Sequence, residues 1–143
     1  MNSILVKQVI VMRKDLKNYK GKPVNEGKLI AQGAHASLAI FTHLMKRKGN
    51  NIFELEMTDD MIEWVEGIFT KVCLGVDSEE ELIELFNKAK EKDLPTCLIT
   101  DNGLTEFKGI YTNTCISIGP AKAELIDEIT GHLKLFKINK TNL

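Results

Sequence analysis

The pattern of apolar and polar positions predicts four strands, the first of them buried on both faces. Ile4–Met12 reads I-L-V-K-Q-V-I-V-M, which is rich in β-forming residues and almost continuously apolar. Three shorter apolar runs follow later in the chain, at Phe69–Val76, Pro95–Thr100 and Tyr111–Ile118. Leu133–Lys137, which reads L-K-L-F-K, is expected to add a short strand near the end.

Helix signals lie between these strands. Asn25 is an N-cap candidate for a long helix that runs to about Arg47, before Gly49-Asn50-Asn51 interrupts it. Ser78–Lys92 begins with a capping Ser, has a Glu three residues later and gathers its lysines at the end. Two further helices are predicted, at Asp59–Glu66 and Ala121–Gly131.

The resulting order, β-α-(α)-β-α-β-β-α, predicts an α/β fold. We expect a mixed four-stranded sheet with helices on both faces, in three layers. A chain of 143 residues suits one domain with one core. Because the sequence contains no repeat, linker or low-complexity segment, residues 1–143 are expected to form a single domain.

Composition is that of an ordinary soluble protein, with 43% hydrophobic and 27% charged residues. No apolar run approaches the roughly 20 residues that cross a bilayer, and the N-terminus lacks a signal-peptide cleavage site. We therefore expect a cytoplasmic protein without membrane association. Cys73, Cys97 and Cys115 lie in strand-like surroundings without a C-x-x-C spacing, so buried reduced thiols are expected.

The overall charge of −1 conceals a strong asymmetry along the chain. Residues 1–50 have a net charge of +8, residues 51–100 have −9, and the remainder balances. The basic N-terminal third is a plausible contact surface for a polyanion such as nucleic acid. The alternative is that these charges simply cover solvated faces.

Several common sites are excluded by their spacing. Gly21–Lys28 resembles a P-loop, but five residues separate its glycines and Leu29 stands where a Ser or Thr should hold magnesium. No G-x-G-x-x-G opens a helix, no G-x-S-x-G is present, and the three histidines lack partners at metal-ligand spacing. The sequence therefore predicts neither a cofactor nor a metal site.

The start of the long helix is one remaining candidate site. Lys28, Gln32 and His35 stand at i, i+4 and i+7, a spacing that places them on one helical face. Small residues keep the surface around them shallow: Gly27, Ala31, Gly33, Ala34, Ala36 and Ala39. A purely solvated stripe is normally crowded with Glu and Lys, so this sparse polar face stands out.

The second candidate is Asp101–Thr105, which reads D-N-G-L-T and follows the third strand directly. Asn-Gly is the strongest signal for a two-residue hairpin turn. Asp101 also stands at the carboxyl end of a strand, where ligands of α/β sheets tend to bind. Spacing alone favours neither interpretation, and the nearby threonines fit ordinary β positions.

Five motifs in this order resemble the type-2 peptidyl-tRNA hydrolases, the archaeal and eukaryotic type that also occurs in some bacteria. The motifs are V-M-R-K-D-L-K, G-K-L-I-A-Q-G-A-H-A, I-T-D-N-G-L-T-E, T-C-I-S-I-G-P and I-D-E-I-T-G-H-L-K-L-F, and they span nearly the whole chain. The resemblance implies a mixed four-stranded sheet between helices and a homodimer. It also implies metal-independent hydrolysis of the ester that joins a peptide, or an N-blocked amino acid, to the terminal ribose of tRNA.

The resemblance implies catalytic roles for four residues: Lys28, Asp101, Thr105 and Thr114. Lys28 would hold a phosphate or the developing oxyanion, Asp101 would orient or deprotonate water, and the threonines would donate hydrogen bonds to the ester or ribose. Peptidyl-tRNA would be bound by the helix start and the basic N-terminal third, through Gly27, Gln32, His35, Arg13, Lys14 and Lys22.

The segment before the long helix departs from the family pattern. Members usually run D-L-K-M-x-K-G-K straight into the helix, whereas this chain carries about six extra residues. Counting forward from Asp15 nominates Lys22 as the catalytic lysine, and counting back from Gln32 nominates Lys28. We prefer Lys28, because the helix fixes its geometry against Gln32 and His35, whereas Lys22 lies on a loop.

Two other functions fit the same residues. The first is a non-catalytic module that binds tRNA or a protein partner, for which the extended Lys17–Glu26 loop and the acidic middle third of the chain are the best support. The second is an esterase for another acyl substrate.

Overall fold

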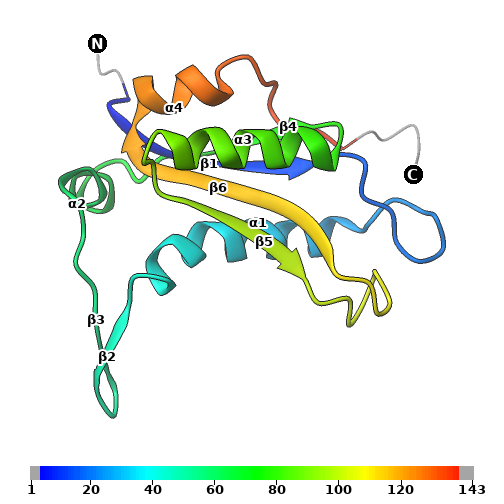
Figure 1. Ribbon diagram of the computed structural model, residues 1–143, viewed down its shortest axis with the longest axis horizontal. Coiled ribbons are helices and arrows are strands. Elements are labelled where there is room, and N and C mark those ends of the chain that lie inside the picture. Colours follow the sequence, from blue (N-terminus) through cyan, green and yellow to red (C-terminus); the bar gives the residue numbers. More distant parts are fainter. Residues whose placement is uncertain (1–3, 139–143) are drawn as a thin grey trace.

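The central feature of the computed structural model, which describes residues 4–138, is a mixed four-stranded sheet of order β4-β1-β6-β5 (Figure 1). β1 pairs parallel to β4 and antiparallel to β6, and β5 pairs antiparallel to β6. The elements in chain order are β1 (Val6–Arg13), α1 (Glu26–Thr42), β2 (Lys46–Gly49), β3 (Ile52–Glu54), α2 (Asp59–Glu66), β4 (Lys71–Val76), α3 (Glu79–Glu91), β5 (Thr96–Asp101), β6 (Thr112–Lys122) and α4 (Ala123–Thr130).

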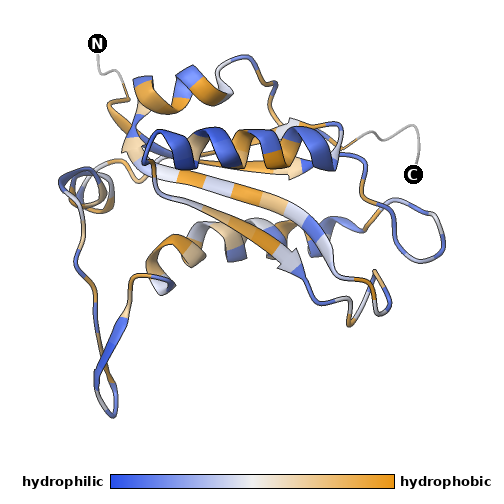
Figure 2. Cartoon of the chain, in the orientation of Figure 1, coloured by the Kyte–Doolittle hydropathy of each residue, from blue (hydrophilic) through white to orange (hydrophobic). Residues whose placement is uncertain are grey.

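Helices cover both faces of this sheet, which confirms the expected three-layer α/β arrangement. Because side chains alternate along a strand, β1 sends Val9 and Val11 to one face and Ile10 and Met12 to the other, and all four are buried. The first pair packs in a cluster with α3 and α4, and the second pair packs with α1 and α2. Figure 2 shows the resulting apolar central strands between helices of mixed character.

The long helix is shorter than predicted. α1 ends at Thr42 rather than near Arg47, and residues 46–54 form a separate antiparallel hairpin of β2 and β3. Gly49-Asn50-Asn51 is therefore not a simple helix break, since Gly49 ends β2 and Asn50-Asn51 form the turn of this hairpin. The guanidinium of Arg47 lies 4.8 Å from the ring centre of Phe53 across the two strands, a contact that a helix would not allow.

Two boundaries near the C-terminus also differ. β6 continues to Lys122, so the last helix begins at Ala123 rather than Ala121. The predicted strand at Leu133–Lys137 is reduced to one isolated bridge between Leu135 and Leu74. This bridge covers part of the open edge of β4.

The cysteine prediction is correct for two residues and wrong for one. Cys97 and Cys115 are buried free thiols, whereas Cys73 is free and exposed because it lies on the edge strand β4. Burial raises the pKa of Cys115 to about 12. No helix within residues 4–138 is long and apolar enough to cross a bilayer.

Candidate active site

Lys28 lies in the first turn of α1, and the residues before it fix that position. The side-chain oxygen of Asn25 accepts the backbone N–H of Lys28 at 2.9 Å, which confirms Asn25 as the N-cap. The amide of Asn25 also donates to the carboxylate of Glu106, in the loop that joins β5 to β6. The start of α1 is thereby connected to that loop.

Asp101 is the last residue of β5, and the chain after it is a long loop rather than a two-residue hairpin turn. Residues 102–111 separate β5 from β6, and the carboxylate Oδ2 of Asp101 accepts the N–H of Gly103 at 2.9 Å. Gly103 has φ +81°, and a Cβ there would lie 2.6 Å from the backbone nitrogen of Ile110. The Asn-Gly pair therefore serves to fold this loop back under Asp101, not to make a tight hairpin.

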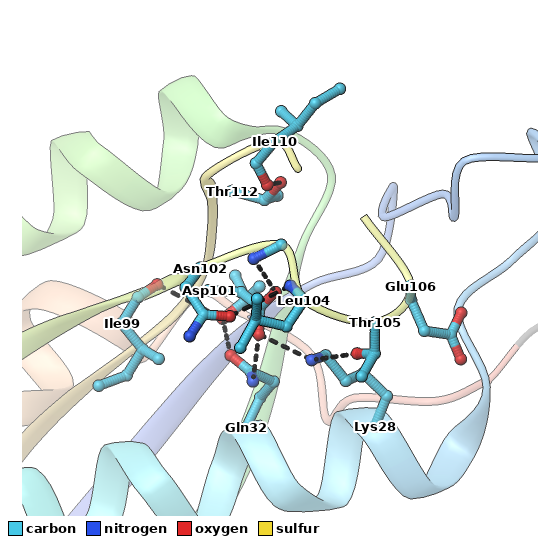
Figure 3. A network of polar contacts seen from close by, with 12 residues as sticks. Lys28, Gln32, Ile99, Asp101, Asn102, Leu104, Thr105, Glu106, Ile110 and Thr112 are labelled. Atoms are coloured by element: carbon cyan, nitrogen blue, oxygen red, sulfur yellow. Dashed lines mark hydrogen bonds and ion pairs between the residues drawn. The ribbon is translucent and has the colours of Figure 1, made fainter. Parts of the chain in front are cut away.

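The two candidate charges meet directly (Figure 3). The ammonium Nζ of Lys28 lies 2.7 Å from Oδ1 of Asp101 and donates a second bond, of 3.0 Å, to the hydroxyl of Thr105. The Lys28 side chain is 17% exposed and that of Asp101 is 8% exposed, so the pair stands at the boundary of core and solvent. Thr105 is exposed. A cation, a carboxylate and a hydroxyl thus converge at one accessible point.

Opposing effects set the ionisation of Asp101. Burial raises its pKa, whereas the hydrogen bonds from Lys28, Gly103 and Gln32 and the charge of Lys28 lower it. The net result is a pKa below the ordinary value for Asp, so this carboxylate is ionised at neutral pH. A weakly basic carboxylate is better suited to orienting a water molecule than to removing its proton completely.

A buried polar layer supports the pair from below. The amide nitrogen of Gln32 donates to Oδ1 of Asp101 at 3.3 Å (Figure 3). The amide oxygen of Gln32 accepts the hydroxyl of Thr114 at 2.6 Å. Gln32 is 7% exposed and Thr114 is fully buried. The hydroxyl of Thr114 therefore donates to Gln32 and is closed off from solvent, and its contact with the ester or ribose stays a prediction.

His35 does not join this cluster. It is exposed, and its imidazole makes none of the side-chain hydrogen bonds found among residues 4–138. The small residues near it also divide into two sets. Gly33, Ala36 and Ala39 are buried where α1 meets the sheet, whereas Gly27, Ala31 and Ala34 are exposed. The first set therefore allows close helix–sheet packing and does not form a shallow surface for substrate.

The three basic residues expected to bind phosphate, Arg13, Lys14 and Lys22, differ in whether a carboxylate of the protein already pairs with them. Arg13 donates to both carboxylate oxygens of Asp15 at 2.9 Å and to Asn113, so it is occupied within the protein. Its pKa is raised, first of all by the hydrogen bond with Asp15. Lys14 pairs with Asp77 at 3.1 Å, and Lys22 is exposed in the loop before α1. Lys28, not Lys22, is the lysine that contacts Asp101.

Grooves in the described part of the chain lie near both ends of the loop before α1. One of about 550 Å³ lies between that loop and residues 136–138, and it adjoins one of about 860 Å³ that runs along the face of α1 that carries Ile30 and Ala34. The two share Glu26, Leu29 and Phe136 in their lining. A third, of about 290 Å³, lies between the loop before α1 and the loop after β5, with Tyr19 and Ile110 in its walls. The Lys28–Asp101 pair lines none of the three.

Comparisons with known proteins identify the family. The model of the family described as Peptidyl-tRNA hydrolase PTH2 matches residues 6–136. A protein named peptidyl-tRNA hydrolase from Methanocaldococcus jannaschii is 40% identical over 130 residues, covering 91% of this chain and 99% of that protein. One from Methanopyrus kandleri, with the same name, is 41% identical over 133 residues, covering 93% of this chain and 100% of that protein.

A solved structure adds evidence on the fold alone. It is that of a protein of unknown function from Agrobacterium tumefaciens, with a TM-score of 0.53 and 16% identity over 94% of this chain and 100% of that one. The sequence comparisons carry the assignment, and they confirm the resemblance read from the five motifs. The chain belongs to the peptidyl-tRNA hydrolase PTH2 family.

Proposed function

We propose that this protein hydrolyses the ester between a peptide, or an N-blocked amino acid, and the terminal ribose of tRNA. The observation that carries the proposal is the contact of Lys28 with Asp101 and Thr105 at an accessible point. Membership of the PTH2 family and the names of the relatives support the substrate. The products are a free peptide acid and a tRNA with an intact terminal ribose, ready for reuse in translation.

The proposed reaction needs no covalent intermediate. A water molecule oriented by the Asp101 carboxylate attacks the ester carbonyl carbon, and the resulting tetrahedral oxyanion is stabilised by the ammonium of Lys28. When this intermediate collapses, the bond from the carbonyl carbon to the ribose oxygen breaks. The ribose oxygen takes up the proton that the water loses, and the peptide leaves as a carboxylic acid. Thr105, which is exposed beside Lys28, donates to the ester or ribose.

Gln32 and Thr114 act as positioning residues in this mechanism. Gln32 holds one Asp101 oxygen through its amide nitrogen, and Thr114 fixes the orientation of that amide through its oxygen. An amide that turned over would present its oxygen to the carboxylate and repel it. Preorganisation of this kind is what keeps catalytic dipoles aligned without reorganisation during the reaction.

The decisive assay is release of tRNA from an N-blocked aminoacyl-tRNA by the purified protein. Asp101→Asn is expected to lose most of the activity while remaining folded. Asp77→Asn removes an exposed surface carboxylate that pairs with Lys14, and it should behave like the wild type. Salt-dependent tRNA binding without release would instead identify a binding module, and faster hydrolysis of small acyl esters would identify another acyl substrate.

We further propose that the reaction proceeds without a metal cofactor, in the cytoplasm, where translation produces the substrate. Protein treated with a chelator and then freed of it should retain its rate on N-blocked aminoacyl-tRNA. A rate restored only by an added transition metal would contradict the metal-independent mechanism.

We also propose that the protein forms a homodimer through the outer face of α1. Ile30, Ala34 and Leu38 make an exposed stripe there at four-residue spacing, with Ile30 73% and Leu38 58% exposed. Ile30 and Ala34 also line the 860 Å³ groove. Sedimentation should give twice the monomer mass, and the double substitution of Ile30 and Leu38 by Glu should give the monomer.

A further inference from the structure

An aromatic ring with two neighbouring lysines lies on the surface close to the Lys28–Asp101 pair. Tyr19 is 55% exposed. The Nζ of Lys108 is 4.8 Å from the centre of its ring, and that of Lys20 is 5.6 Å away. We refer to Tyr19, Lys20 and Lys108 as the Tyr19 platform. Its aromatic face and its charges come from two segments that are far apart in sequence.

The platform is attached to the loop that contains Thr105. The backbone N–H of Tyr19 donates to the carbonyl oxygen of Glu106 at 2.9 Å. Glu106 follows Thr105 directly, and Thr105 contacts Lys28 (Figure 3). Tyr19 also lines the 290 Å³ groove between the two loops, together with Phe107 of the loop after β5. Tyr19 is thus hydrogen-bonded to the residue that follows Thr105, a member of the proposed catalytic cluster.

The loop that carries Tyr19 is ordered by its own hydrogen bonds. The side-chain oxygen of Asn18 accepts the N–H groups of Lys20 and Lys22, at 2.9 Å and 3.1 Å. Asn18 also exchanges backbone bonds with Lys22 and Gly21. Tyr19 and Lys20 therefore occupy a fixed turn, so that binding a ligand there costs little additional ordering.

This combination matches the chemistry of single-stranded nucleic acid. A base stacks on an exposed aromatic ring whatever its identity, and lysines beside the ring attract the phosphates that connect successive bases. Residues 14–25 contain four lysines and one aspartate, so the charge of the whole loop favours an anionic ligand. An apolar protein partner would fit poorly against a ring flanked by two ammonium groups.

We propose that the Tyr19 platform binds the unpaired nucleotides at the 3′ end of tRNA, with a base on the Tyr19 ring and phosphates beside Lys20 and Lys108. The inference rests on the proposed function, because the ester at the Lys28–Asp101 pair is what brings that end of the tRNA to this surface. The platform would hold the strand that leads to the ester while taking no part in the chemistry.

The test compares two deacylated RNA hairpins, one with the acceptor stem and its unpaired 3′ nucleotides and one with a blunt stem. Tyr19→Ala should raise the Kd for the first RNA about tenfold and leave the Kd for the blunt RNA unchanged. Tyr19→Phe, which keeps the ring, should stay within twofold of the wild type for both. In hydrolysis of N-blocked aminoacyl-tRNA, Tyr19→Ala should raise KM and change kcat less than twofold, since stacking is the same in the ground and transition states.

Phe53→Ala is the matched control, because Phe53 is also 55% exposed and also lies beside a cation, at the other end of α1. It should bind both RNAs like the wild type, and thermal unfolding should verify that all variants are folded. The inference is overturned if Tyr19→Ala binds both RNAs with the wild-type Kd, or if the substitution raises the Kd for the blunt RNA as much as the Kd for the other RNA. Wild-type protein that shows the Tyr19-dependent binding but releases no tRNA would support the platform and refute the hydrolase proposal.

Discussion

Two basic projections leave the protein at opposite ends of α1, and they look alike in composition (Figure 1). The loop of residues 14–25 carries four lysines and one aspartate, and the β2–β3 hairpin of residues 46–54 carries three basic residues and one glutamate. Each displays an aromatic ring that is 55% exposed, with a cation 4.8 Å from its centre. By charge and aromatic content alone, both would be candidate RNA contacts.

Their contacts distinguish them. The loop is bonded through Tyr19 to Glu106, beside the proposed catalytic cluster. In the hairpin, two basic side chains bond within the hairpin itself: Lys48 pairs with Glu54 at 3.1 Å, and Arg47 donates to the carbonyl of Asn50 at 2.8 Å. The 17 residues of α1 between the two projections span about 25 Å at 1.5 Å per residue. A basic surface therefore acquires a specific role from its distance to the reacting groups, not from its composition.

The largest expected effect separates the two lysine candidates, one in the loop and one in the helix. Lys28→Ala removes the proposed oxyanion stabiliser and should lower kcat for N-blocked aminoacyl-tRNA about 10²–10³-fold. Lys22→Ala removes one exposed loop charge and should cost no more than a few-fold, mainly in KM. Initial rates across substrate concentrations measure both.

The reverse result would place the chemistry in the loop. If Lys22→Ala abolishes kcat and Lys28→Ala does not, the counting of residues back from Gln32 is wrong. The 2.7 Å ion pair with Asp101 would then be a purely structural contact.

The next effect concerns the buried layer under the pair. Thr114→Val keeps the shape of the side chain but leaves the Gln32 amide oxygen without its 2.6 Å donor. An unsatisfied buried acceptor costs about 1–3 kcal/mol, so the free energy of unfolding in urea should fall by that amount. Activity should fall as well, because Gln32 is free to turn over.

Thr105→Val provides the contrast, since Thr105 is exposed. It should leave the unfolding free energy within about 0.5 kcal/mol of the wild type and lower only the rate. If both substitutions lower the unfolding free energy equally, then Thr114 is not specifically a structural residue and Thr105 is not specifically a substrate-contacting one.

The ion pair also predicts how stability depends on pH. The folded-state pKa of Asp101 lies below its value in the unfolded chain, which is about 3.9 for a free Asp. Its contribution to stability is therefore complete above about pH 4 and is lost as pH falls through the lower folded-state value. The difference in unfolding free energy between the wild type and Asp101→Asn should be constant at neutral pH and shrink in acid. The corresponding difference for Phe53→Ala should not change with pH.

Sequence alone predicts most of the sheet, because its strands and helix caps give strong local signals. The apolar run of β1, the cap at Asn25 and the cap at Ser78 each define an element whose type is correct. Lys28 and Asp101 are predictable for a different reason. Their motifs match a known family, whereas the spacing of Asp101–Thr105 left a turn and a ligand site equally favoured.

The parts that were missed depend on contacts between distant residues. Nothing local in the sequence indicates that the hydroxyl of Thr114 donates to Gln32, 82 positions earlier. The same holds for the hydrogen bond of Tyr19 to Glu106 and for the exposure of Cys73 on an edge strand. The basic strand β2 lacks alternating apolar residues, so the sequence predicts no strand there and the expected helix, which runs to about Arg47, includes its first two residues.

A smaller expected effect tests whether the lysines of each projection contact RNA phosphates. The double substitution of Lys20 and Lys108 by Ala should reduce the slope of log Kd against log salt concentration for RNA with an unpaired 3′ end. Two lost phosphate contacts on a single strand correspond to a change of about 1.4 in that slope. The double substitution of Lys46 and Lys48 by Ala, on the hairpin, should leave the slope unchanged. Equal changes would mean that both projections touch the RNA.

The smallest expected effect is that of removing the hairpin altogether. Replacing residues 46–54 by a short Gly-Ser turn deletes strands that pair with each other and supply none of the residues of the two buried clusters. The unfolding free energy should therefore stay within about 0.5 kcal/mol of the wild type, since closing a short flexible loop differs little in entropy from closing a slightly longer one. KM for N-blocked aminoacyl-tRNA should stay within twofold, because the RNA that reaches the Lys28–Asp101 pair passes the other end of α1. A tenfold rise in KM on this truncation, with stability intact, would show that the tRNA body extends along α1 to the hairpin, and the two projections would then be parts of one RNA surface.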